Sequence, residues 1–160
     1  MNNQEILMKY AEEVAYSSKG HYKTASWIKT SLNIYILLPI TLSVILIIFP
    51  DSPQLLSRLL NCFIFIFSIL ALTSPLVSNQ EQAVKTISSH MTLGNEYLSI
   101  YKEIRNISAE SQITKEIIDN IYEKVKSLDE KTSNLRISFA GRVISKCLIK
   151  KEMDLDWIYK

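Results

Sequence analysis

Leu32–Phe49 reads LNIYILLPITLSVILIIF, and Leu59–Val77 reads LLNCFIFIFSILALTSPLV. Neither stretch contains a charged residue. As helices rising about 1.5 Å per residue, each would be about 27–28 Å long, close to the ~30 Å hydrocarbon core of a bilayer. Because backbone groups in lipid must be bonded within their own segment, both stretches are predicted to be transmembrane helices. A soluble helical bundle is the alternative, but the rest of the chain offers little material to cover two such helices.

A short polar segment over 50–58 is predicted to join the two spans on the outside of the membrane. It begins Pro50-Asp51-Ser52-Pro53, which breaks the chain, and Arg58 is its single basic residue. Positive charges at the other ends of the spans predict that both termini are cytoplasmic. Those flanking residues are Lys19, Lys23, Lys29 and Lys85. The prediction is thus one domain over 1–160, with spans at 32–49 and 59–77 and a cytoplasmic helical region over 78–160.

The composition argues against most soluble enzyme classes. The net charge of +2 is too small to indicate a nucleic-acid-binding protein, so no direct nucleic-acid partner is expected. Three glycines and two histidines leave little material for a phosphate-binding loop or a metal cluster. The chain has neither a Walker loop nor a His-Glu-x-x-His motif, and we expect no catalysis, cofactor or metal. Cys62 is predicted near the outer end of the second span and Cys147 in the cytoplasm, so no disulfide is expected between them.

Five residues inside the predicted spans have polar groups or break helical hydrogen bonding: Pro39, Thr41, Ser43, Ser68 and Pro75. Each proline removes one backbone hydrogen bond and kinks its helix. The hydroxyl groups would lie at a similar depth if the hairpin is in register. Two interpretations are open: kinks with hydroxyls bonded to their own backbone, or a polar face used for helix association or a water path.

Both spans are predicted to continue into the cytoplasm as long helices over about 5–49 and 59–106, paired as an antiparallel coiled coil. Apolar and small residues recur at alternating three- and four-residue spacing before the first span and after the second. They are Leu7, Tyr10, Val14, Ser17, His21, Thr24 and Ile28, then Val84, Ile87, Met91, Gly94, Leu98 and Tyr101. Pairing the span centres places Ala15 opposite Gly94 and His21 near His90.

Two histidines at such positions have several possible roles. A zinc site needs three or four ligands, and neither cysteine nor carboxylate completes one beside His21 and His90. An ordinary, satisfied contact between helices is one interpretation. A pH-sensitive or register-setting contact is the other, because imidazole titrates near neutrality.

The remaining chain predicts a third amphipathic helix at about 112–131 that folds back along the coiled coil. From Arg136 to Lys151 the chain then has basic residues and no acid, namely Arg136, Arg142, Lys146, Lys150 and Lys151. Such a segment is a candidate for binding an anionic membrane surface. A packed helix with a solvated basic edge is an equally open interpretation.

The layout resembles the SLATT domain, a two-transmembrane effector of bacterial conflict systems. The residues that carry the resemblance are Tyr16 and Tyr22-Lys23-Thr24-Ala25 before the hairpin and, after it, His90, Gly94-Asn95-Glu96-Tyr97-Leu98 and Lys102-Glu103-Ile104-Arg105. Together, the predicted stripes and the resemblance single out five helix-contact residues: His21, His90, Gly94, Tyr97 and Leu98. The resemblance covers roughly residues 5–130.

The resemblance implies an antiphage effector of the bacterial inner membrane that oligomerises and permeabilises the bilayer. Its trigger would be a nucleotide-making or sensing partner: a cyclic-oligonucleotide nucleotidyltransferase, a nucleotide-binding SLOG protein or a reverse transcriptase. The alternative is a non-lethal membrane anchor or regulatory subunit that holds a soluble partner.

Overall fold

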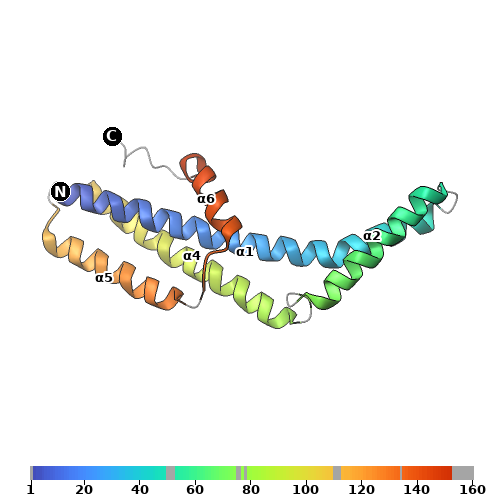
Figure 1. The fold of residues 1–160 in the computed structure, drawn as a ribbon. Helices are drawn as coiled ribbons and strands as arrows, with labels where there is room; N and C mark the ends of the chain where they lie inside the picture. Colours follow the sequence, from blue (N-terminus) through green and yellow to red (C-terminus); the bar gives the residue numbers. More distant parts are fainter. Residues whose placement is uncertain are drawn as a thin grey trace. The chain divides into compact units, whose positions relative to one another are not determined.

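The chain is all-helical throughout its described part. The computed structural model describes residues 2–49, 53–74, 77, 79–109, 113–133 and 135–152, with side chains as far as Ser145. The helices are α1 (Asn3–Ile48), α2 (Gln54–Thr73), α4 (Gln80–Ser108), α5 (Lys115–Thr132) and α6 (Phe139–Glu152) (Figure 1). The predicted helical class is confirmed, and α1 and α2 are long and apolar enough to cross a membrane.

The helices form two compact units. The first contains Met1–Ala25 and Ser88–Lys160, and the second contains Ser26–Ile87. Helix α1 contributes residues to both units and matches the helix predicted over 5–49. It runs through Pro39 without interruption.

The second long helix predicted over 59–106 is wrong, because two helices, α2 and α4, occupy this range. Helix α2 ends at Thr73, and Ser74 has an extended backbone with φ −71° and ψ 123°. The residue before a proline is pushed out of the α region, and residue 75 is proline. Helix α4 then begins with its own cap, since the Asn79 side-chain oxygen accepts a hydrogen bond from the Gln82 amide at 3.2 Å.

The loop predicted over 50–58 is also too long, because α2 already begins at Gln54. The prediction placed the boundary at Arg58, the last charge before the apolar stretch. A charged residue does not end a helix, whereas Pro53 has φ −52° and ψ 135° and sits directly before the first helical turn. Helix α2 thus starts five residues before the uncharged stretch.

In the unit formed by Ser26–Ile87, the apolar side chains stay largely uncovered. No residue is buried in the most apolar 18-residue window of either α1 or α2. The most exposed large apolar residues here are Ile47, Ile48, Phe49, Leu55, Phe65 and Leu72, each more than 60% exposed. This unit therefore has no hydrophobic core of its own among the described residues.

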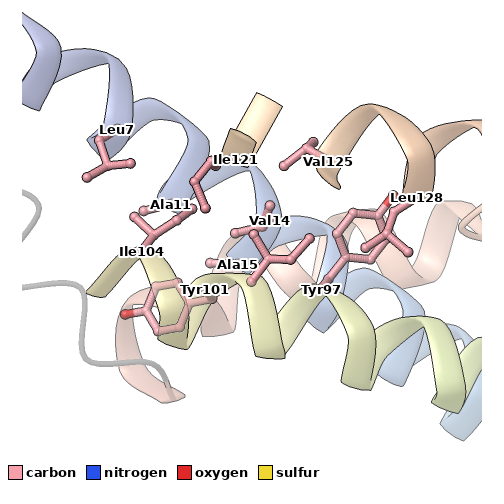
Figure 2. Packing of buried hydrophobic residues seen from close by; sticks show 11 residues of the cluster. Leu7, Ala11, Val14, Ala15, Tyr97, Tyr101, Ile104, Ile121, Val125 and Leu128 are labelled. Carbon is pink, nitrogen blue, oxygen red and sulfur yellow. The ribbon is translucent and has the colours of Figure 1, made fainter. Parts of the chain in front are cut away.

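The other unit has a core made by α1, α4 and α5 (Figure 2). Helix α5 corresponds to the helix predicted over about 112–131, and Thr114 caps it by accepting a hydrogen bond from the Ile117 amide. It runs antiparallel to α4, because Lys124 contacts Glu103 whereas Lys131, later in α5, contacts the earlier Glu96. The buried apolar residues are Leu7, Ala11, Val14, Ala15, Tyr97, Ile100, Tyr101, Ile104, Ile121, Val125 and Leu128.

The predicted contact stripes match the buried residues only in part: the predicted residues that are buried are Leu7, Val14, His21, Thr24, Gly94 and Tyr101. On α1 the buried positions at alternating four- and three-residue spacing are Leu7, Ala11, Val14, Ser18, His21 and Ala25. On α4, Val84 and Met91 are exposed, and the buried residues are Ala83, His90, Leu93, Gly94, Tyr97, Ile100, Tyr101 and Ile104. Small side chains occupy several of these positions because they let two helix backbones approach closely. The prediction favoured larger residues such as Tyr10.

All three glycines of the chain lie inside helices and mark close contacts with other parts of the chain. A side-chain carbon added at Gly94 would meet the Tyr22 ring at 3.2 Å. One added at Gly141 would meet the Thr24 hydroxyl and, at 2.9 Å, the carbonyl oxygen of Gly20. The helix-propensity cost of glycine, about 1 kcal/mol relative to alanine, is offset at Gly141 by a close approach to the Gly20 carbonyl that a larger side chain would disturb.

We expect Gly141→Ala to loosen α6 from α1. The added methyl group would meet a backbone carbonyl that cannot move aside, and overpacking of this kind costs about 1–3 kcal/mol. Hydrogen–deuterium exchange of residues 138–145 should therefore speed up several-fold. Gly20→Ala is the matched control, because its nearest neighbour is the flexible end of Ile137, which can rotate away. Equal exchange in both variants would contradict the backbone clash.

Candidate functional site: a buried histidine pair

A layer of buried polar side chains lies in the unit that contains the core. Its members are Ser18, His21, Thr24 and His90, with Ser145 on α6. The Ser18 hydroxyl donates to the Gly94 carbonyl oxygen at 2.8 Å, and the Ser138 amide donates to the Thr24 hydroxyl oxygen at 3.0 Å. Buried polar groups are expensive unless they are bonded, and these bonds tie α1 to α4 and α6.

His21 and His90 form the centre of this layer. They are 2% and 3% exposed, and their Nδ1 atoms lie 2.8 Å apart. One Nδ1 must carry the hydrogen while the other accepts it, so the two rings are in different tautomers. The rings are 5.0 Å apart between centroids, and His21 also stacks on Tyr97 at 5.7 Å with an interplanar angle of 13°.

The pair is uncharged at neutral pH. Burial, and then the neighbouring His90, lower the pKa of His21 from its ordinary 6.5 to about 4. Burial also lowers the pKa of His90. A second proton would place like charges on two rings in contact and remove the acceptor from the Nδ1–Nδ1 bond.

Tyr97 extends the network from the histidines to α5. The ring is 2% exposed, and its hydroxyl donates to the Asp129 Oδ1 at 2.6 Å. Burial and the bond to Asp129 raise the pKa of the Tyr97 phenol. Figure 2 shows Tyr97 beside Leu128 at this end of the core. His21, Tyr97 and Asp129 therefore link α1, α4 and α5 through one stack and one hydrogen bond.

The arrangement can fix which residues of α1 face which residues of α4. A shift of one helix by a turn would separate the two Nδ1 atoms and leave two buried imidazoles without partners. The observed pairing places Ser18, not Ala15, at Gly94. The predicted contact between Ala15 and Gly94 is therefore wrong by about one helical turn.

Within the described part of the chain, the surroundings of the pair include aromatic and hydroxyl groups. Among the described residues no group of three or more His, Cys, Asp or Glu side chains could hold a metal ion. Two open grooves flank α5. One, of about 330 Å³, is lined by α4 and α5 residues including Glu103 and Lys124. The other, of about 450 Å³, is lined by α1 and α5 residues including Glu13, Tyr122 and Asp129.

The polar residues of the predicted spans are not gathered into a site. Thr41 donates to the Leu37 carbonyl and Ser43 to the Pro39 carbonyl, each at 2.8 Å. Both hydroxyls are therefore used within α1, as in the first of the two interpretations. Ser68 is partly exposed on α2, and Pro75 lies outside the described residues.

The helix-contact residues are placed together, whereas the basic residues are only partly described. His21, His90, Gly94 and Tyr97 are buried in one unit, and Leu98 packs partly buried against the same core. Arg136 and Arg142 are exposed. The side chains of Lys146, Lys150 and Lys151 lie outside the described part, although their backbone belongs to α6.

Sequence reasoning missed Ser18, the Thr24–Ser138 contact and the Tyr97–Asp129 bond. One available signal pointed to the close contacts: glycine inside a helical pattern usually marks a packing requirement. Hydroxyl groups and acids have no such signal, because Ser18 and Asp129 are indistinguishable in sequence from surface residues of the same type.

Comparison of the chain with protein-family models, with curated proteins and with solved structures finds no match. The SLATT resemblance therefore stays a prediction based on the residues quoted above.

Acidification should destabilise the histidine pair. A histidine with a lowered folded-state pKa binds fewer protons than in the unfolded chain, so its contribution is present above pH 6.5 and is lost as the pH falls towards about 4. The loss should reach about 3 kcal/mol, measured by unfolding in detergent. In His21→Gln/His90→Gln this loss should disappear.

The double variant is needed because Glu13 also contributes to the pH dependence of stability, in the opposite direction. Burial, and then Asp129, raise the pKa of Glu13, so acidification adds stability through this group and opposes the histidine effect. The difference between the wild type and the double variant isolates the histidines. An identical pH dependence in the two proteins would contradict a neutral buried pair.

Tyr97→Phe should lower the free energy of unfolding by about 1–2 kcal/mol, because it removes a short hydrogen bond to a carboxylate while keeping the stacked ring. Thermal unfolding in detergent measures the loss. Tyr122→Phe is the matched control, since Tyr122 is exposed on α5 and its ring contact with Tyr10 survives the change. A larger effect at Tyr122 than at Tyr97 would count against the network.

Proposed function

We propose that the chain is a membrane effector of a bacterial antiphage system, which oligomerises in the inner membrane and permeabilises it when a partner protein signals infection. In this proposal α1 from about Leu32 and α2 cross the bilayer as a hairpin, and both termini face the cytoplasm. The cytoplasmic part is the bundle of α1, α4 and α5.

The observation that carries the proposal is the uncovered apolar surface of α1 and α2. No residue in their most apolar windows is buried, and Leu72 is 79% exposed. Leaving one such side chain in water forfeits about 1.5–3 kcal/mol. Insertion of these side chains into an apolar environment removes that penalty, and the hydrocarbon core of a bilayer matches the length of the two apolar segments. The effector role is supported by the SLATT-like residues.

The proposed switch acts through α1. The partner would bind the bundle and alter the packing of α1 against α4 around His21 and His90. Because α1 is a single helix from Asn3 to Ile48, a change in its rotation at the bundle also rotates the segment that begins at Leu32. Neighbouring copies would then associate through newly presented faces.

High-level expression in a bacterial host, monitored with a membrane-potential dye, tests the proposal. We expect crowding of the chain in the membrane to favour oligomers and to depolarise the cells. Ile40→Asp/Ile66→Asp should abolish depolarisation, because an aspartate at the centre of a span costs about 3 kcal/mol on insertion scales.

Ile40→Leu/Ile66→Leu is the matched control and should depolarise the cells like the wild type, since both side chains remain apolar. Each position is exposed, at 57% and 51%, so neither change disturbs a core. Cells that stay polarised while the wild-type chain fills the membrane fraction would argue for the alternative, a non-lethal anchor of a soluble partner.

A further inference from the structure

Helix α6 has one face that is fixed to α1. The Ser138 amide donates to the Thr24 hydroxyl oxygen, and the Ser138 hydroxyl in turn accepts from the Gly141 amide at 3.0 Å, which caps the first turn of α6. Gly141 lies against Thr24 and the Gly20 carbonyl, and Ser145 is buried one turn further on. These contacts determine which side of α6 faces away from α1.

The opposite face carries exposed apolar side chains. Phe139 is 83% exposed, the highest value of any large apolar residue in the described chain, although Ser138 and Gly141 near it are held by the contacts above. Val143 is exposed four residues later, and residues four apart share one helix face. A phenylalanine held outward in this way has apolar area available for a partner.

Positive charge runs beside this apolar row. Arg142 is exposed next to Val143, and residues 146 and 150, both lysine, continue its four-residue spacing. No acidic residue occurs between Arg136 and Lys151. A row of cations beside exposed apolar residues is typical of helices that lie in the interface of an anionic membrane.

Building on the proposed function, we propose that the outer face of α6, defined by Phe139, Arg142 and Val143, lies on the anionic cytoplasmic leaflet of the membrane that α1 and α2 cross. Phe139 and Val143 enter the headgroup boundary, while Arg142 contacts lipid phosphates, and the lysines at positions 146 and 150 add positive charge to the same segment. Each cation near such a surface contributes favourably, and phenylalanine adds apolar burial.

Lipid is favoured over a protein partner by charge and by position in the chain. Anionic lipid headgroups can match the basic run all along its length. The two described grooves, where a second copy of this chain could receive α6, each contain both acidic and basic residues and match it less well. Thr24, which holds α6, belongs to the same helix as the uncharged segment and precedes its first residue, Leu32, by eight positions. Docking of α6 would therefore constrain α1 next to the proposed span.

Depth-dependent quenching in nanodiscs tests this proposal on the full chain. The native tryptophans are removed by Trp27→Phe/Trp157→Phe, and a single reporter is introduced by Phe139→Trp, an exposed and tolerant position. Lipids with a quencher near the headgroup are used, in zwitterionic discs and in discs with added phosphatidylglycerol. We expect at least twofold stronger quenching in the anionic discs, and its loss at about 1 M salt, where the Debye length is about 3 Å.

Two further reporters in the same background separate this proposal from the proposed function. Phe65→Trp, on an exposed position of α2, should be quenched by lipids labelled along the acyl chain if the hairpin spans the disc. Tyr122→Trp, on the exposed side of α5, should not be quenched. Quenching at Phe65→Trp without quenching at Phe139→Trp would overturn the α6 proposal alone. Absence of quenching at Phe65→Trp would overturn the proposed membrane insertion as well.

Other results of the same measurements also support or overturn the α6 proposal. Equal quenching of Phe139→Trp in zwitterionic and anionic discs would overturn the charge-dependent part of the proposal. A blue-shifted but unquenched reporter that responds to the number of chains per disc would assign the face to a second copy. Arg142→Glu/Lys146→Glu should reduce quenching in anionic discs to the zwitterionic level, while Arg142→Lys should preserve it.

Discussion

The apolar side chains along α2 and along the second part of α1 have no protein cover in the described chain. None of the residues in their apolar windows is buried, and at about 1.5–3 kcal/mol for each large side chain the total penalty in water would exceed the 5–15 kcal/mol that stabilises an ordinary domain. Such exposed apolar surface favours contact with an apolar environment over contact with water. A bilayer fits the length of the two uncharged segments, 32–49 and 59–77, and the proposed function begins from that fit.

The unit built from α1, α4 and α5, in contrast, has a buried hydrophobic core. Here apolar residues are covered, and small side chains bring the helices close enough for hydroxyls and imidazoles to find partners. The pairing of His21 with His90 adds specificity, because a buried neutral imidazole tolerates few alternative neighbours. Since Asp129 binds Tyr97 and Tyr97 stacks on His21, α5 is held in the same register. A partner that displaced α5 would therefore act on the histidine contact.

Helix α6 contacts α1 with one face and, in the proposal above, contacts the membrane surface with the other. Its inner face is occupied by contacts to Thr24 and Gly20, which leaves Phe139 directed outward. In the proposed docking, lipid binding by α6 and packing of α1 against α4 would involve the same stretch of α1. Reassociation of the bundle and detachment of α6 would then be coupled, because Gly20 and Thr24 both lie within three residues of His21 in sequence.

The sequence by itself determined the helical class, the two uncharged segments, and the existence of α1 and α5, because these follow from local properties: hydropathy, periodicity and helix length. It also indicated that His21 and His90 belong to facing stripes. Tertiary structure decided which of two neighbouring stripes is buried, that Ser18 meets Gly94, and that Tyr97 reaches Asp129. Those choices depend on how closely two backbones approach, which is a property of residue pairs far apart in the chain. The break between α2 and α4 is only partly determined by the sequence. Proline indicates that a helix ends there, but the Asn79 cap, seen in the structure, shows where the next helix begins.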